Sequence, residues 1–132
     1  MPQLVKGGKW VFGWCVVSES GEIQIPPAAF QEYGFILGEA VIYYRGSHRS
    51  GGFSVGRKQK VTASGSPVLL RSIGQAVMHE NGRVGVPPGL GIHPGERLLA
   101  GRGSGLALGF IRYGLIYEEA LKHPGLEVFI IS

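Results

Sequence analysis

The chain has 132 residues, of which 44% are hydrophobic, and this predicts a single domain over residues 1–132 with a substantial core. Its 13 Lys and Arg residues against 9 acidic residues give a formal net charge of +4, which permits a polyanionic partner without requiring one. The single cysteine, Cys15, excludes an internal disulfide, and no apolar run approaches the roughly 20 residues of a spanning helix. We therefore expect a cytoplasmic protein without membrane association.

The first half of the chain predicts short strands joined by turns. Residues 10–17 are rich in Trp, Val and Phe, which favour a strand, and Gly21 lies in the turn that follows. Pro27 suits the first position of a short helix, and Gly34 suits its end. We expect strands over residues 10–17, 22–25, 39–45 and from 53, one or two helical turns over 27–33, and a glycine loop over 46–52.

The second half predicts the same kinds of element. Asn81-Gly82 is a strong hairpin signal because both residues tolerate positive φ, and Pro87 ends the strand that carries Val84 and Val86. Residues 115–123 predict the one clear helix, which Pro124 stops. Further strands are expected over residues 67–72, 76–79, 98–102, 106–111 and 126–131.

The two halves repeat each other. Gly21–Pro27 matches Gly82–Pro88 at an offset of 61 (82 − 21), and Arg45-Gly46-Ser47 matches Arg102-Gly103-Ser104 at an offset of 57 (102 − 45). A deletion between Pro88 and Gly91 reconciles the two offsets. Either copy alone buries too little surface to be stable, so we expect one pseudo-twofold β-barrel in which the copies interleave their hairpins. The expected boundaries are repeat 1 at about 14–57, a linker at 58–74, repeat 2 at about 75–112, and a C-terminal helix and strand at 114–132.

The second copy resembles the SpoVT–AbrB family, which includes the MazE antitoxins and the tandem MraZ-type proteins. The resemblance rests on Gly82-Arg83-Val84, Val86-Pro87, Gly91-Ile92 and Pro94-Gly95-Glu96. It implies a mainly β fold, the swapped-hairpin AbrB-like barrel, here built from two internal repeats. It also implies a prokaryotic transcription regulator that binds double-stranded DNA, is a homo-oligomer, needs no cofactor and is not an enzyme. The first copy matches at Gly21, Ile23, Ile25, Pro26, Gly38 and Glu39.

The chain departs from the family at basic positions. Members usually carry basic residues before the Gly-Arg turn and at the end of the short helix, where this chain has Val16-Val17, Val77-Met78 and Phe30-Gln31. Glu22 stands where Arg83 stands in the second copy. These departures leave an alternative open, in which the barrel is a protein-interaction or oligomerisation module that has lost DNA binding.

Seven cations are candidate DNA contacts. Arg83 fits a bidentate phosphate contact, although it also fits a solvated turn. Arg45 and Arg102, with Arg49 nearby, form either a matched pair of anion contacts or caps on two hairpin ends. The densest basic cluster is Arg57, Lys58 and Lys60. If a strand continues through it, both lysines lie on one face. That face would be either a patch that binds a polyanion or a charged edge that resists aggregation.

Other chemistry has weaker support. Cys15 lies in an apolar strand and is expected in the core, the histidines have no metal-ligand spacing, and no metal site is expected. The run Gly101–Gly105 lacks the Lys-Ser/Thr ending and the following helix of a nucleotide loop. Aromatic residues on the expected strands are either core or base-stacking groups, with core favoured: Trp10, Trp14, Tyr43 and Tyr44.

Overall fold

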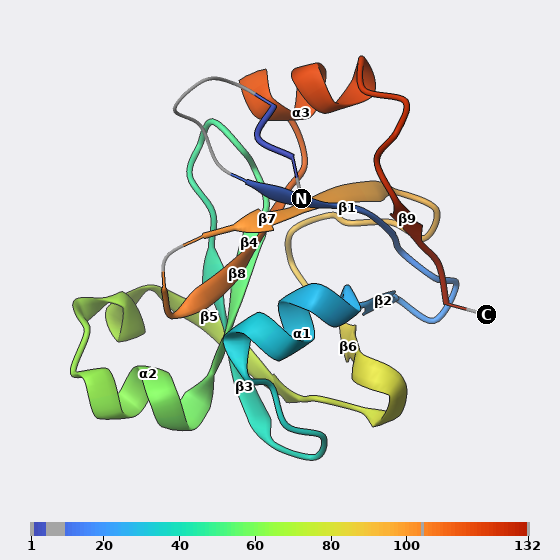
Figure 1. Cartoon of the computed structure of the whole chain (residues 1–132). Coiled ribbons are helices and arrows are strands. Elements are labelled where there is room, and N and C mark those ends of the chain that lie inside the picture. Colours follow the sequence, from blue (N-terminus) through green and yellow to red (C-terminus); the bar gives the residue numbers. More distant parts are fainter. Residues whose placement is uncertain (1, 5–9, 104, 132) are drawn as a thin grey trace.

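The computed structural model describes residues 2–4, 10–103 and 105–131, so Ser104 of the matched tripeptide lies outside the described residues. The described chain is mainly β, with a mixed seven-stranded sheet and a separate two-stranded sheet (Figure 1). The strands are β1 Val11–Val16, β2 Glu22–Gln24, β3 Ala40–Arg45, β4 Phe53–Arg57, β5 Ser72–Val77, β6 Arg83–Gly85, β7 Arg97–Arg102, β8 Ala107–Ile111 and β9 Val128–Phe129. The helices are α1 Pro27–Tyr33, α2 Lys58–Ser64 and α3 Leu115–Leu121, with 3-10 turns η1 Pro67–Arg71 and η2 Glu80–Gly82.

The large sheet has the strand order β5-β3-β4-β8-β7-β1-β9. Every pair in it is antiparallel except β1 with β9, which is parallel. Strands β5 and β9 are its two edges, and no ladder between described residues joins them into a closed ring.

The first strand of each sequence copy pairs with the third strand of the other copy. β1 pairs with β7, placing Cys15 opposite Leu98, and β5 pairs with β3, placing Ala76 opposite Val41. Both ladders shift register once, between Val11 and Gly13 in one and opposite Tyr43 and Tyr44 in the other. Backbone hydrogen bonds therefore join the two copies through both of these ladders.

The two-stranded sheet is the meeting point of the matched turns. Its strands β2 and β6 are antiparallel, with Ile23 opposite Val84 and Gln24 opposite Arg83. The turn before β6 has the expected positive φ at both residues, 63° at Asn81 and 72° at Gly82. The predicted tight turn is confirmed, but the strands beside it form no hairpin ladder, because β5 pairs with β3 and β6 pairs with β2, and only an isolated bridge joins His79 to Arg83.

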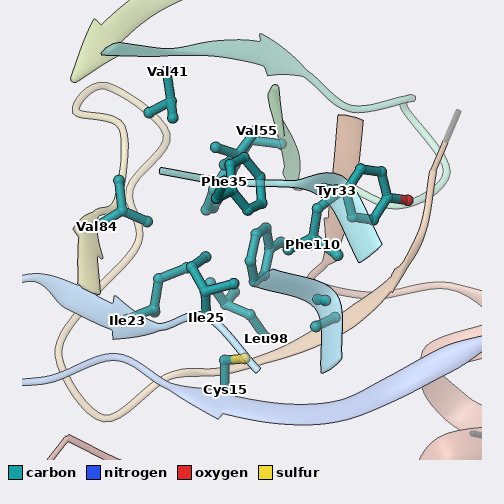
Figure 2. Close-up of a cluster of buried hydrophobic side chains, with 14 of the residues drawn as sticks. Cys15, Ile23, Ile25, Tyr33, Phe35, Val41, Val55, Val84, Leu98 and Phe110 are labelled. Carbon is teal, nitrogen blue, oxygen red and sulfur yellow. The ribbon is translucent and has the colours of Figure 1, made fainter. Parts of the chain in front are cut away.

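A single main core lies between the small sheet and the large one. Figure 2 shows Ile23, Val84, Val55 and Phe110 gathered around the same space, from β2, β6, β4 and β8. The hydroxyl of Tyr43 crosses this core to donate a hydrogen bond to the carbonyl of Gly85. The outer face of the large sheet carries two smaller clusters, one under α3 and one under α2.

The connection between the copies differs from the expectation. The predicted strand over residues 67–72 is wrong, because η1 occupies Pro67–Arg71 and pairing begins only at Ser72. Before it, residues 58–64 form α2, which buries Val61 and ends at Gly65 in the left-handed conformation. Lys, Gln and Ala favour a helix here, and one buried Val anchors it to the sheet. The remaining strand and helix predictions agree with the structure within a few residues.

The C-terminal segment packs within the chain. α3 confirms the predicted helix, and Leu126 beyond it is buried beside Trp14. The expected strand over residues 126–131 is shorter than predicted, because only Val128 and Phe129 pair with β1. Gly13 on β1 makes this approach possible, since a Cβ there would lie 2.5 Å from the carbonyl oxygen of Glu127.

Three of the four aromatic residues expected as core or base-stacking groups belong to the core. Trp14, Tyr43 and Tyr44 are buried, whereas Trp10 is 43% exposed. The three α-helices that the structure describes have seven residues each, far short of the length needed to cross a bilayer.

Candidate nucleic-acid interface

The charges of this chain are unevenly distributed along it. Residues 40–79, hereafter the acid-free segment, contain six of the 13 basic residues and none of the 9 acidic ones. This segment forms β3, β4, α2, η1 and β5, which adjoin one another at one end of the large sheet (Figure 1). Positive potential is therefore concentrated on that side of the molecule. The six residues are Arg45, Arg49, Arg57, Lys58, Lys60 and Arg71.

Two of the predicted DNA contacts are ion-paired. Arg57 donates from Nε and Nη2 to one carboxylate oxygen of Glu39, at 3.2 and 3.0 Å. Arg102 donates from Nε and Nη2 to the two carboxylate oxygens of Glu32, at 2.8 and 2.6 Å. The hydrogen bond from Arg102 lowers the pKa of the Glu32 carboxyl. A second anion at either arginine would have to compete with a carboxylate that is already bound.

The matched arginines Arg45 and Arg102 differ in their surroundings. Glu32, which pairs with Arg102, belongs to α1. The second copy has no helix between β6 and β7, because its deletion falls there. Arg45 is exposed, and its side chain has no ion-pair or hydrogen-bond partner among the described residues. The deletion thus leaves one member of the pair free and the other neutralised.

Arg83 begins β6 opposite Gln24. Its guanidinium makes no ion pair with a described residue, and its buried Nε atom has no hydrogen-bond partner. Val84 points into the main core, so the side chain of Arg83 points away from it. Glu22 shares this outer face of the small sheet, which reduces its positive potential.

The two lysines of the basic cluster do not share a face. Lys58 and Lys60 lie in α2, where residues two positions apart point about 200° apart around the axis. The strand interpretation of this cluster is therefore wrong. Both lysines are exposed and make no ion pair with a described residue, so both remain available to solvent anions.

The loop that carries Arg49 is held firmly in place. The amide of Gly46 donates to the carbonyl of Gly52 at 2.9 Å, and the amide of Arg112 donates to the carbonyl of Ser50 at 2.8 Å. Tyr113 adds a hydrogen bond from its hydroxyl to the carbonyl of His48 at 3.0 Å. The exposed Arg49 is therefore presented by an ordered hairpin end.

Arg71 was not among the DNA contacts predicted from the sequence. It ends η1 and lines, together with Arg45, a cleft of about 240 Å³ on the outer face of the large sheet. The sequence did contain a signal for Arg71. Residues 40–79 include no acidic residue, and this places Arg71 in the same acid-free segment as the other candidate cations. Its proximity to Arg45 was not readable, since it depends on the pairing of β5 with β3.

The described side chains contain no arrangement suited to metal or thiol chemistry. No three His, Cys, Asp or Glu residues among them are grouped to hold a metal ion. Cys15 is buried as expected, its Sγ lies 3.4 Å from the carbonyl of Gln24, and desolvation raises the pKa of its thiol.

Comparison with known proteins adds no relative. No family model, no curated protein and no solved structure matches the chain.

Proposed function

We propose that this protein is a DNA-binding transcription regulator of the SpoVT–AbrB type, with both halves of a swapped-hairpin barrel in one chain. The observation that carries the proposal is the exchange of strand partners between the copies, β1 with β7 and β5 with β3. Such an exchange is what two interleaved hairpins produce.

Register supports a twofold relation between the copies. Ile23 lies opposite Val84, and these residues occupy the same position in the two matched sequences. Antiparallel pairing of equivalent residues arises where a local twofold axis passes between two strands. Gly13 and Gly74, which also match at the offset of 61 (74 − 13), both have positive φ and both lie at the register shifts.

The acid-free segment is the proposed DNA face. Arg45, Arg49, Lys58, Lys60 and Arg71 are its cations without carboxylate partners among the described residues. Cations of this kind bind phosphates and displace condensed counterions, which supplies affinity without base recognition. Arg57 belongs to the same segment, although Glu39 offsets its charge.

A salt titration of binding to a mixed-sequence duplex tests the proposal. We expect affinity to fall steeply with salt, and Lys58→Ala together with Lys60→Ala to make the slope shallower by about two. Lys122→Ala is the control, because Lys122 is an exposed lysine outside the acid-free segment, where it pairs with Glu119 at 3.4 Å. Absence of binding at low salt, with the protein folded, would reject the proposal.

One observation elsewhere on the molecule favours the alternative, in which the protein is an interaction or oligomerisation module. Large apolar side chains are exposed around α3, including Tyr113 at 49%, Leu115 at 69% and Leu121 at 54%. Exposed apolar side chains that form a patch commonly mark interfaces. Sedimentation of the parent and of Leu115→Ser would show concentration-dependent assembly that the substitution weakens. Assembly without DNA binding would favour this alternative over the regulator.

A further inference from the structure

The outer face of the large sheet is hollow between its two helices. α2 covers Ile42 and Ala107, and α3 covers Leu99 and Ile111. Between these clusters the adjacent strands β4 and β8 present only small residues, with Ser54 paired to Gly109. The resulting cleft, here called the arginine cleft, lies between the β3–β4 loop and η1. Its defining residues are Arg45, Arg71, Tyr44, Ser47, Ser54 and Gly109.

The arginine cleft has uncompensated positive charge. Arg45 and Arg71 both line it, neither has a carboxylate partner among the described residues, and no lining residue is acidic. Two like charges at one small volume repel each other unless an anion lies between them. The charge pattern therefore points to a bound anion.

Tyr44 provides an independent sign of a missing partner. Tyr44 is 4% exposed and lines the cleft, and its hydroxyl has no hydrogen-bond partner in the described structure. Burial raises the pKa of this phenol, so it keeps its proton at neutral pH and can donate to an acceptor. Unpartnered buried hydroxyls are uncommon in folded proteins, and an acceptor entering the cleft would satisfy this one.

Size and donor number select the anion. The volume of about 240 Å³ lies below the usual range for drug-sized ligands, about 300–1,000 Å³, and suits a single anionic group. The oxygens of one phosphate group can accept hydrogen bonds from two guanidinium groups and from hydroxyl groups at the same time. Ser47 lies at the rim, and its hydroxyl donates to the Oγ of Ser50 at 3.3 Å, so an anion would have to take over this donor.

We propose that the arginine cleft binds one phosphate group, held by Arg45 and Arg71 with Tyr44 donating from beneath. This inference deepens the proposed function and rests on it for the source of the group, a backbone phosphate of duplex DNA. A free phosphorylated small molecule offers the same chemistry. The experiment therefore has one arm for each source.

The first arm uses inorganic phosphate, titrated against chloride at matched ionic strength and followed by NMR of the arginine side chains. We expect saturable shifts of two arginine signals, which the Arg45 and Arg71 variants assign. Tyr44→Phe should weaken this binding about tenfold, the effect of one lost hydrogen bond to a charged group. Its melting temperature should not fall, because the hydroxyl has no partner to lose. Arg49→Ala is the control, since Arg49 lies in the same loop without lining the cleft.

The second arm repeats the duplex titration with Tyr44→Phe and Arg71→Ala. Weaker binding in both arms supports a backbone phosphate in the cleft. Weaker phosphate binding with unchanged DNA binding overturns the DNA source and assigns the cleft to a small phosphorylated ligand. Phosphate binding in a parent that does not bind DNA rejects the proposed function while the phosphate site stands. Normal DNA binding with no saturable phosphate shift, or with no effect of Tyr44→Phe in either arm, overturns the cleft proposal.

Discussion

Arg102 at the end of β7 forms a two-point ion pair with Glu32 at the end of α1, although 70 residues separate them in the chain. The pair connects the helix of the first copy to the third strand of the second. Its counterpart cannot form at Arg45, because the second copy lacks the helix that would supply the carboxylate. A deletion in one repeat thereby determines which of two matched arginines is free to bind an anion.

This asymmetry predicts unequal effects of two matched substitutions on DNA affinity. Arg45→Ala should weaken binding and reduce the salt slope by about one, because it removes an unpaired cation. Arg102→Ala should change the slope much less, because Glu32 already offsets its charge. Duplex titrations at several salt concentrations measure both slopes. Equal losses from the two variants would show that the ion pair does not control anion binding.

The same pair predicts a small pH-dependent contribution to stability. The pKa of Glu32 is lowered by Arg102 from its ordinary 4.5, so the ionised carboxylate is favoured in the folded state. The stabilisation is present above the unfolded pKa and is lost as the pH falls through the folded pKa. Glu32→Gln should therefore be less stable than the parent at pH 7, and the difference should disappear in acid. A denaturant series against pH measures this, and a difference that grows in acid would contradict it.

Arg83→Ala tests the expectation that the Gly-Arg turn contacts phosphate. Arg83 belongs to the small sheet, whereas the arginine cleft lies on the outer face of the large sheet, and the main core lies between the two sheets. With the acid-free segment as the DNA face, Arg83→Ala should weaken binding less than Arg45→Ala does. The reverse order, together with stronger binding by Glu22→Arg, would move the DNA face to the small sheet.

Gly52 predicts a steric limit on the loop that presents Arg45 and Arg49. A Cβ at Gly52 would lie 1.7 Å from the carbonyl oxygen of Phe110, which is backbone and cannot rotate away. Gly52→Ala should cost about 3 kcal/mol or more in the free energy of unfolding. Gly105→Ala is the control, because nothing lies within 4 Å of its added Cβ. Similar unfolding midpoints for the two variants would contradict the packing described for this loop.

The sequence predicted the elements whose ends are determined by neighbouring residues in the chain. Pro27 and Gly34 fixed both ends of α1, and Asn81-Gly82 fixed the turn before β6. In contrast, α2 depends on a single buried side chain, Val61, whose burial is decided by the sheet beneath it. The periodicity of so short a segment is not distinctive, so a linker was the natural expectation for it.

The candidate site could be predicted only in part. The basic residues were visible in the sequence, and so was their freedom from nearby acids. The ion pair of Arg102 with Glu32 and the meeting of Arg45 with Arg71 were not, because each joins elements that become neighbours only through strand pairing. The unpartnered hydroxyl of Tyr44 is likewise a property of packing and has no signature in the sequence.

The pairing of β1 with β7 also has a consequence for synthesis on the ribosome. Val16 is synthesised before its partner Arg97, which follows 81 residues later in the chain (97 − 16). During that interval β1 has apolar side chains and backbone amides with no native strand to receive them, and contacts of such large sequence separation form slowly. The nascent first half is therefore exposed to aggregation. We expect the yield of folded protein in cells to depend on holding chaperones. This dependence should be stronger than for a protein whose neighbouring strands pair in the order of their synthesis.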